Sequence, residues 1–210
     1  MTALRVAAIV EGHAEAKSAV RELVTRVSTE LLGADYVNVL HPIRHPRSKL
    51  VQPASLLRAV DLAQLLLQQA APADRSLILI LFDADEDRPC ILAPALLNML
   101  QKERSHLDIA LVLPNPEFET WFAAAAESLT QFFDLSVVAP AADPETARQR
   151  KGTVSRWMHG RYGETADQVR LTHAMDLNLC RSRSGSFDKL CRELERRLHG
   201  LPAINTTPPS

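Results

Sequence analysis

Residues 76–87 read SLILILFDADED. The apolar run is too short for a buried helix, and its isoleucine and leucine content is typical of a central strand covered on both faces. Asp83, Asp85 and Asp87 follow where this strand ends. Open α/β sheets bind their ligands at the carboxyl ends of their strands. The stretch therefore predicts both a parallel sheet and a functional edge of that sheet.

A second apolar run, RVAAIV at 5–10, ends in the same way at Glu11 and Gly12. Apolar residues at helical spacing follow it and predict a helix over 13–32. The other elements are expected as strands at 36–40, 77–82 and 109–113, helices at 53–67 and from Pro89 onward, and a loop at 41–49. Strands that alternate with helices indicate an α/β fold with about four strands, mainly parallel, flanked by helices.

The pattern changes after Pro114, where helical periodicity replaces strands. A helix is expected over 117–133, followed by further helices up to residue 198, the last one capped by Ser186. We therefore expect an α/β domain at 1–122 and a helical extension packed on it at 123–200. The polar, proline-rich end, 201–210, is expected to be a disordered tail.

Composition excludes several classes of protein. The chain has 210 residues, 46% of them hydrophobic, and its three cysteines form no CxxC pair, so a disulfide framework or zinc ribbon is not indicated. The apolar amino terminus is broken by Arg5 and is too short for a membrane span. A cytoplasmic protein without membrane contact is expected.

Charge is distributed unevenly along the chain. Residues 71–144 hold 12 acidic and 4 basic residues, whereas residues 145–200 hold 12 basic and 7 acidic ones. A metal-dependent enzyme acting on a polyanion needs this division, because carboxylates hold cations while Arg and Lys hold phosphates. Two solvated helix faces of opposite sign explain the counts as well, and both interpretations stay open.

The acidic residues at the two strand ends suit a hard divalent cation, Mg²⁺ or Mn²⁺, in a phosphoryl-transfer site. In an extended chain Asp83 and Asp85 point the same way and can share one ion. Glu11 can bind a second ion or act as general acid or base, and Gly12 lets the backbone approach a phosphate closely. Asp87 suits a metal or the cap of the next helix equally well.

Other candidates are single charged residues. Glu119 is a further predicted metal ligand, whereas Glu117 can serve as a ligand or merely complement a helix dipole. Basic groups that could hold a scissile phosphate include Arg181, although most surface cations are only solvated. The predicted substrate-binding residues are Gly12, Glu15, Lys49, Lys151 and Arg183.

Three competing functions lack their sequence features. No GxxxxGK[ST] motif is present, which argues against a P-loop ATPase. Asp87 stands where haloacid dehalogenase-type phosphatases have a threonine or valine. The chain has only two tyrosines, too few choices for a topoisomerase nucleophile on a moving domain.

The order and spacing of four segments resemble the DUF4276 family of bacterial Toprim-like proteins over nearly the whole chain. These segments are IVEGHAE at 9–15, LFDADED at 81–87, PNPEFETWF at 114–122 and SRSGSF at 182–187. The resemblance implies a Toprim fold in which Glu11 is the strand-end glutamate and Asp83 and Asp85 are the metal-binding pair.

This family looks like a group of relatives of the overcoming-lysogenization-defect nucleases, often associated with ATPase partners in phage defence. The sequence thus predicts a Mg²⁺-dependent nuclease or related phosphodiesterase, with Glu11, Asp83 and Asp85 as catalytic residues. The alternative is a non-catalytic Toprim-like module that binds a partner ATPase or nucleic acid.

Overall fold

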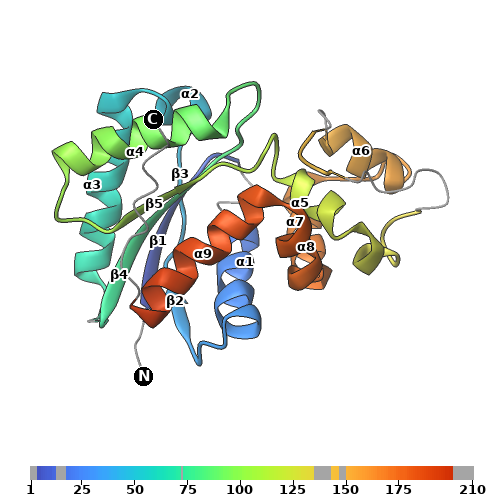
Figure 1. Ribbon diagram of the computed structural model, residues 1–210, viewed down its shortest axis with the longest axis horizontal. Helices are drawn as coiled ribbons and strands as arrows, with labels where there is room; N and C mark the ends of the chain where they lie inside the picture. The colour runs from blue at the N-terminus through green and yellow to red at the C-terminus, as the bar shows by residue number, and fades with distance from the viewer. Residues whose placement is uncertain (1–3, 13–17, 72, 135–142, 147–149, 201–210) are drawn as a thin grey trace, which may run out of the picture.

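A computed structural model describes residues 4–12, 18–71, 73–134, 143–146 and 150–200. Across these residues the strands form a single parallel sheet of five strands in the order β2-β1-β4-β5, with the short β3 also paired to β1 (Figure 1). Helices flank the sheet and make up the carboxyl-terminal part of the described chain. The predicted α/β class with a mainly parallel sheet is therefore confirmed.

The elements follow one another along the chain in βα units and then as helices alone. They are β1 (Leu4–Val10), α1 (Val20–Arg26), the π-helix η2 (Val27–Leu31), β2 (Val37–Val39), β3 (Ile43–Arg44), α2 (Arg47–Leu50), α3 (Pro53–Gln69), β4 (Arg75–Leu81), α4 (Pro89–Glu103), β5 (Ile109–Val112), α5 (Glu119–Ala124), the 3₁₀ turn η3 (Ala126–Leu129), α6 (Arg150–Trp157), α7 (Glu164–Ala174), α8 (Leu177–Arg183) and α9 (Gly185–His199).

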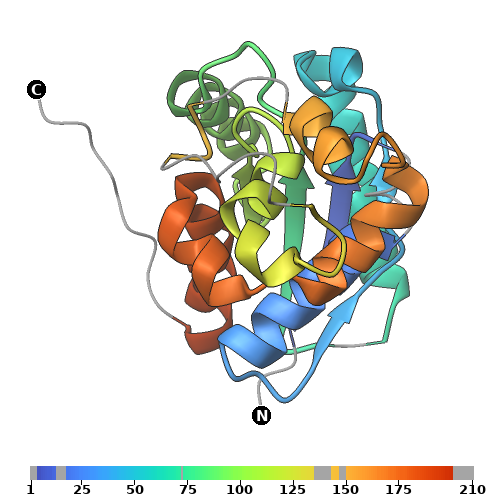
Figure 2. The same ribbon diagram turned by 90° about the vertical axis from the view of Figure 1, so that its right-hand side faces the viewer.

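Side chains of the central strands alternate between two apolar cores. Val6 and Ala8 of β1 belong to the core shared with α1, α5 and α9, whereas Ala7 and Ile9 belong to the core shared with α3 and α4. Figures 1 and 2 show α3 and α4 on one face of the sheet and α1 and α9 on the other. Burial on both faces explains why β1 and β4 are almost continuously apolar.

The last described helix, α9, packs on the sheet beside β5 and η2. Phe187 is fully buried at its start, with its ring 5.3 Å from that of Trp121 and nearly perpendicular to it. The expected cap at Ser186 is wrong, because Ser184 is the residue whose hydroxyl accepts the Phe187 N–H. Ser186 instead accepts a hydrogen bond from Trp121 Nε1 at 2.9 Å, which ties α9 to α5.

The expected loop at 41–49 contains two short elements. Ile43 and Arg44 pair with Ile9 and Val10 of β1, and the His45 N–H donates to the Val10 carbonyl at 2.8 Å. Helix α2 follows, with Leu50 buried. Two prolines and the lack of apolar periodicity hid these elements, because β3 depends on its pairing with β1 and α2 packs against α3.

The described part of the predicted helix 13–32 is helical but changes geometry within it, whereas the predicted helix 117–133 is interrupted. The first passes from α1 into the π-helix η2. There the Thr29 hydroxyl donates to the Thr25 carbonyl, which in an α-helix accepts the Thr29 N–H. The second breaks into α5 and η3, where the Ser128 hydroxyl donates to the Ala125 carbonyl at 2.6 Å. Residues 13–17 and the expected tail at 201–210 lie outside the described residues.

Within the described ranges, no helix combines the length and the apolar character that a membrane span requires.

Candidate functional site

The carboxyl edge of the sheet brings the two predicted acidic segments together. The parallel register of β1 and β4 pairs Val10 with Leu81, so Glu11 and Asp83 leave neighbouring strands one and two residues beyond that pair. Neighbouring strands lie about 4.8 Å apart. Asp83 also contacts the segment between β5 and α5, where its Oδ1 accepts a hydrogen bond from the Phe118 N–H at 2.9 Å. The segments that leave β1, β4 and β5 therefore meet at one edge.

The turn after Asp83 is held from two sides. On one side the amides of Ala84 and Asp85 donate to the carbonyls of Pro114 and Pro116, at 3.0 and 2.9 Å. On the other side Arg47 of α2 donates to the carbonyls of Asp83 and Ala84, at 3.2 and 3.1 Å.

Arg47 also forms ion pairs with two carboxylates of this turn. Its Nε lies 3.0 Å from Asp85 Oδ2, and its Nη2 contacts Asp87. Asp85 has a φ of 52°, the left-handed region that few residues other than glycine adopt. Arg47 and the two proline carbonyls thus fix a backbone conformation that the sequence alone does not favour.

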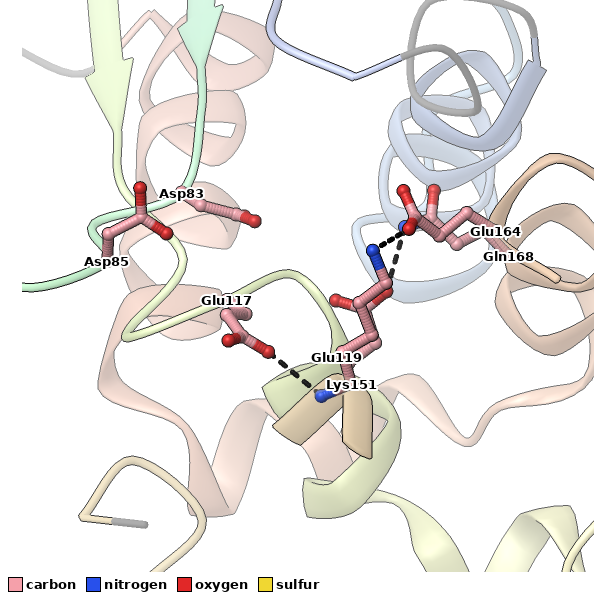
Figure 3. A pocket seen from close by; sticks show the side chains of 7 residues that line it. All are labelled: Asp83, Asp85, Glu117, Glu119, Lys151, Glu164 and Gln168. Atoms are coloured by element: carbon pink, nitrogen blue, oxygen red, sulfur yellow. Dashed lines mark hydrogen bonds and ion pairs between the residues drawn. The ribbon is translucent and has the colours of Figure 1, made fainter. Parts of the chain in front are cut away.

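A pocket of about 160 Å³ opens beside this turn. Among the described residues it is lined by Asp83, Asp85, Glu117, Glu119, Lys151, Glu164 and Gln168. Figure 3 shows Asp83 and Asp85 on one side, the group around Glu119 on the other, and Glu117 between them. The lining holds five carboxylates and one lysine in this part of the chain, so the pocket favours cations.

Glu119 is the buried carboxylate on the side of the pocket opposite Asp83 and Asp85 (Figure 3). It is 3% exposed, and its Oε1 accepts hydrogen bonds from the Tyr162 hydroxyl at 2.6 Å and from Gln168 Nε2 at 3.1 Å. A buried carboxylate requires such donors, because burial without them is costly. Two residues from the segment around α7 therefore orient Glu119 toward the pocket.

The start of α6 supplies the lysine of the pocket. The Lys151 N–H donates to Glu117 Oε2 at 2.8 Å, and the Lys151 ammonium pairs with Glu164 (Figure 3). The neighbouring Arg150 is buried and donates to the Pro144 carbonyl at 2.7 Å. Its burial lowers the pKa of its guanidinium, an effect that the nearby Asp143 and Glu117 carboxylates oppose.

The structure gathers some of the predicted site residues and separates others. Asp83, Asp85, Glu119 and Lys151 line one pocket. Glu11 is half-buried at the same edge, beside Gly12, but neither lines this pocket. Asp87 instead turns to Arg47.

Three basic candidates lie elsewhere. Lys49 is exposed on α2, and Arg183 binds the Ala124 carbonyl and Glu127, whose pKa it lowers. Arg181 pairs with Asp188 and Glu195 of α9. Glu15 lies outside the described residues.

Sequence reasoning missed Arg47, Tyr162, Glu164 and Gln168. Arg47 stands in an acid-free basic stretch, which was a usable signal. The other three follow no motif, because helical segments far along the chain bring them to the strand edge only through tertiary packing. Glu117, left undecided by the sequence, is a lining residue.

The donor set suits a hard divalent cation. Within the described ranges no three His, Cys, Asp or Glu side chains come close enough together to hold a metal ion. Mg²⁺ does not need such a cage, because it commonly uses one or two carboxylates together with waters and substrate phosphates. Asp83 and Asp85, on one side of the pocket, fit this smaller requirement.

Comparisons with protein-family models, with curated proteins and with solved structures found no match to this chain.

Proposed function

We propose that this protein is a Mg²⁺-dependent nuclease, or a related phosphodiesterase, that acts on nucleic acid. The observation that supports it is the pocket at the carboxyl edge of the parallel sheet, where five of the described lining residues are carboxylates. Ligands bind at this edge in open α/β sheets. A pocket of this charge accepts a phosphodiester only if cations offset its carboxylates.

Asp83 and Asp85 are the residues that would hold the cation. Bound there, Mg²⁺ or Mn²⁺ would stabilise negative charge on a phosphoryl oxygen and lower the pKa of a coordinated water. The Phe118 N–H fixes the orientation of the Asp83 carboxylate, and Arg47 fixes the turn that carries Asp85. A backbone amide thus positions Asp83 and an arginine side chain positions the turn of Asp85, both without any ligand.

Other residues of the edge would handle the proton and the phosphate. Glu11, half-buried at the end of β1, would act as general acid or base near the leaving oxygen. Lys151 would exchange its pairing with Glu164 for a phosphate oxygen of the substrate. Glu119, buried and hydrogen-bonded, would stay fixed as a negative group on the far side of the pocket.

The proposal is tested by metal binding and cleavage together. Calorimetric titration of the purified protein with Mn²⁺ should show binding that Asp83→Asn weakens, and Asp83→Asn should lower cleavage of a labelled oligonucleotide at least about 100-fold. Asp87→Asn is the matched control, since Asp87 lies in the same turn but does not line the pocket. Wild-type protein that neither binds Mn²⁺ nor cleaves any nucleic acid contradicts the proposal.

Membership of the DUF4276 family, a Toprim-like fold, an ATPase partner, a role in phage defence and a cytoplasmic location are part of the proposal. They are supported by the four sequence segments that resemble that family. Co-purification with an ATPase encoded beside the chain would support the partner, and co-expression of both in cells challenged with phage would test the defence role.

A second candidate function is a non-catalytic module that binds nucleic acid or a partner ATPase. Several pocket carboxylates already contact polar or basic groups of the chain, as Asp85 does with Arg47 and Glu164 with Lys151. These pairings favour a site that needs no metal. Binding that persists in EDTA and survives Asp85→Asn, without any cleavage, would support this candidate.

A further inference from the structure

The segment from His41 to Leu50, here named the basic arm, lies at the same edge of the sheet as the pocket. Between residues 41 and 49 it carries two arginines, one lysine and two histidines, and no acidic residue. Pairing of β3 with the end of β1 fixes the position of the arm, as does the hydrogen bond from the His45 N–H to the Val10 carbonyl. The arm therefore runs directly beside the point where Glu11 leaves β1.

The basic arm has an inner and an outer set of side chains. On the inner side Arg47 contacts the Asp83–Asp87 turn, and His45 Nε2 lies 3.0 Å from Ser55 Oγ of α3. On the outer side Arg44 and Lys49 are exposed, and neither forms an ion pair with any residue in the described part of the chain. The inner contacts of Arg47 thus hold the segment that carries these two exposed cations against the acidic turn, two residues of which line the pocket.

The pocket itself cannot attract a polyanion. Its described lining carries five carboxylates against Lys151, and Lys151 is paired with Glu164. A nucleic acid that places one phosphate in this pocket brings several more phosphates to the surrounding surface. Cations at the rim are needed to offset that repulsion, since phosphate contacts supply most of the non-specific affinity for nucleic acids.

We infer that the basic arm binds the phosphate backbone of nucleic acid and leads it to the pocket, with Arg44 and Lys49 as contact residues. The inference rests on the proposed function for its substrate class. Arg47 connects the arm to the pocket, because its hydrogen bonds and ion pair with the acidic turn fix the position of the arm relative to that turn. Contacts of this kind position a substrate without reading its sequence.

Binding measured without metal separates this inference from catalysis. The probe is a fluorescein-labelled 20-nucleotide DNA, single-stranded and as a duplex, followed by anisotropy in EDTA between 50 and 200 mM salt. Arg44→Gln and Lys49→Gln should each weaken binding about 3- to 10-fold and reduce the salt slope by about 0.7 to 0.9, the change expected for one lost phosphate contact. An unchanged urea midpoint shows that each variant is folded.

Lys102→Gln is the matched control. Lys102 is exposed, forms no ion pair within the described residues, and lies near the end of α4, a helix that starts beside the acidic turn and runs away from it. It should bind DNA like the wild type. Wild-type protein that does not bind DNA in EDTA, or a loss in Lys102→Gln equal to that in Lys49→Gln, overturns the inference.

A small diester tests the proposed function separately. Hydrolysis of bis(p-nitrophenyl) phosphate by the wild type with Mn²⁺, lost in Asp83→Asn, depends on the pocket and needs no long backbone contact. If the wild type hydrolyses the diester but Arg44→Gln and Lys49→Gln bind DNA as well as the wild type does, the proposed function is supported and the inference about the basic arm is refuted. DNA binding that depends on both residues, without any hydrolysis, supports the arm and contradicts the enzyme.

Discussion

Arg47→Gln is expected to destabilise the protein by loosening the acidic turn. The wild-type guanidinium donates to two backbone carbonyls, at 3.2 and 3.1 Å, and pairs with Asp85 and Asp87. A hydrogen bond from a charged donor is worth about 1.5–3 kcal/mol, whereas an exposed ion pair adds about 0.2–1 kcal/mol. Glutamine can keep one of these hydrogen bonds, but it lacks the several N–H donors and the positive charge of the guanidinium group.

The side chain of Arg47 is 22% exposed and its carboxylate partners are 47% exposed, so water replaces part of what is lost. We therefore expect the free energy of unfolding to fall by about 2–3 kcal/mol, which is less than the sum of those contacts because water and the glutamine amide replace part of them. Urea denaturation measures this loss as a lower midpoint with an unchanged slope.

The matched control is Arg88→Gln. Arg88 follows the same turn, is exposed, and makes no ion pair or side-chain hydrogen bond among the described residues. Its replacement should change the free energy of unfolding by less than about 0.5 kcal/mol. If Arg47→Gln loses no more than this control, the reasoning about the turn is refuted.

Hydrogen exchange gives a local measurement of the same change. The amides of Ala84 and Asp85 donate to the carbonyls of Pro114 and Pro116. They should exchange faster in Arg47→Gln than in wild type, because the turn then lacks its second support. Unchanged exchange at both amides would show that the proline carbonyls alone hold the turn.

Arg197 is 3% exposed and donates hydrogen bonds to Asp108, Glu193 and the Ile109 carbonyl. Arg197→Ala should therefore lower the free energy of unfolding by about 3 kcal/mol. Arg192 is exposed, so Arg192→Ala should change that free energy by less than about 1 kcal/mol. Equal urea midpoints would contradict this. Gly33 has a φ of +71°, and a Cβ added to it would meet no other atom within 4 Å, so Gly33→Ala should lower the melting temperature through backbone strain of about 1 kcal/mol alone. Calorimetry that finds no change would show that the turn relaxes. Burial raises the pKa of Cys191 to about 12, so at pH 8 iodoacetamide should modify the exposed Cys90 and leave Cys191 unmodified until the protein is denatured. Peptide mass spectrometry measures both, and equal labelling rates would refute the burial argument.

The central strands could be predicted because their signal is local. Leu77–Phe82 and Val6–Val10 are apolar on both faces, so the length and composition of each run suffice to place them. The segment at 41–49 has no such signal. Its short strand exists because β1 offers an unpaired edge beyond β2, and no local pattern contains that information.

One half of the site could be predicted and the other could not. Asp83 and Asp85 follow a recognisable strand and do line the pocket. The expected extended chain at Asp85 is wrong, because its backbone is in the left-handed region. Glu164 and Gln168 of α7 complete the pocket, and Gln168 together with Tyr162, which precedes that helix, hydrogen-bonds Glu119 of α5. The sequence carries the chemistry of these residues but not their location.

The position of α9 affects the order in which the chain can fold during synthesis. All described strands have been made once Val112 leaves the ribosome, yet Leu190 and Leu194, which belong to the core on one face of the sheet, are made more than seventy residues later. During this interval one face of the nascent sheet is incompletely covered. Chains with exposed apolar surface and strand edges bind chaperones or aggregate. A ribosome-bound chain arrested before Gly185 should be protease-sensitive over β1 and β4, and release of α9 from the exit tunnel should protect both strands together.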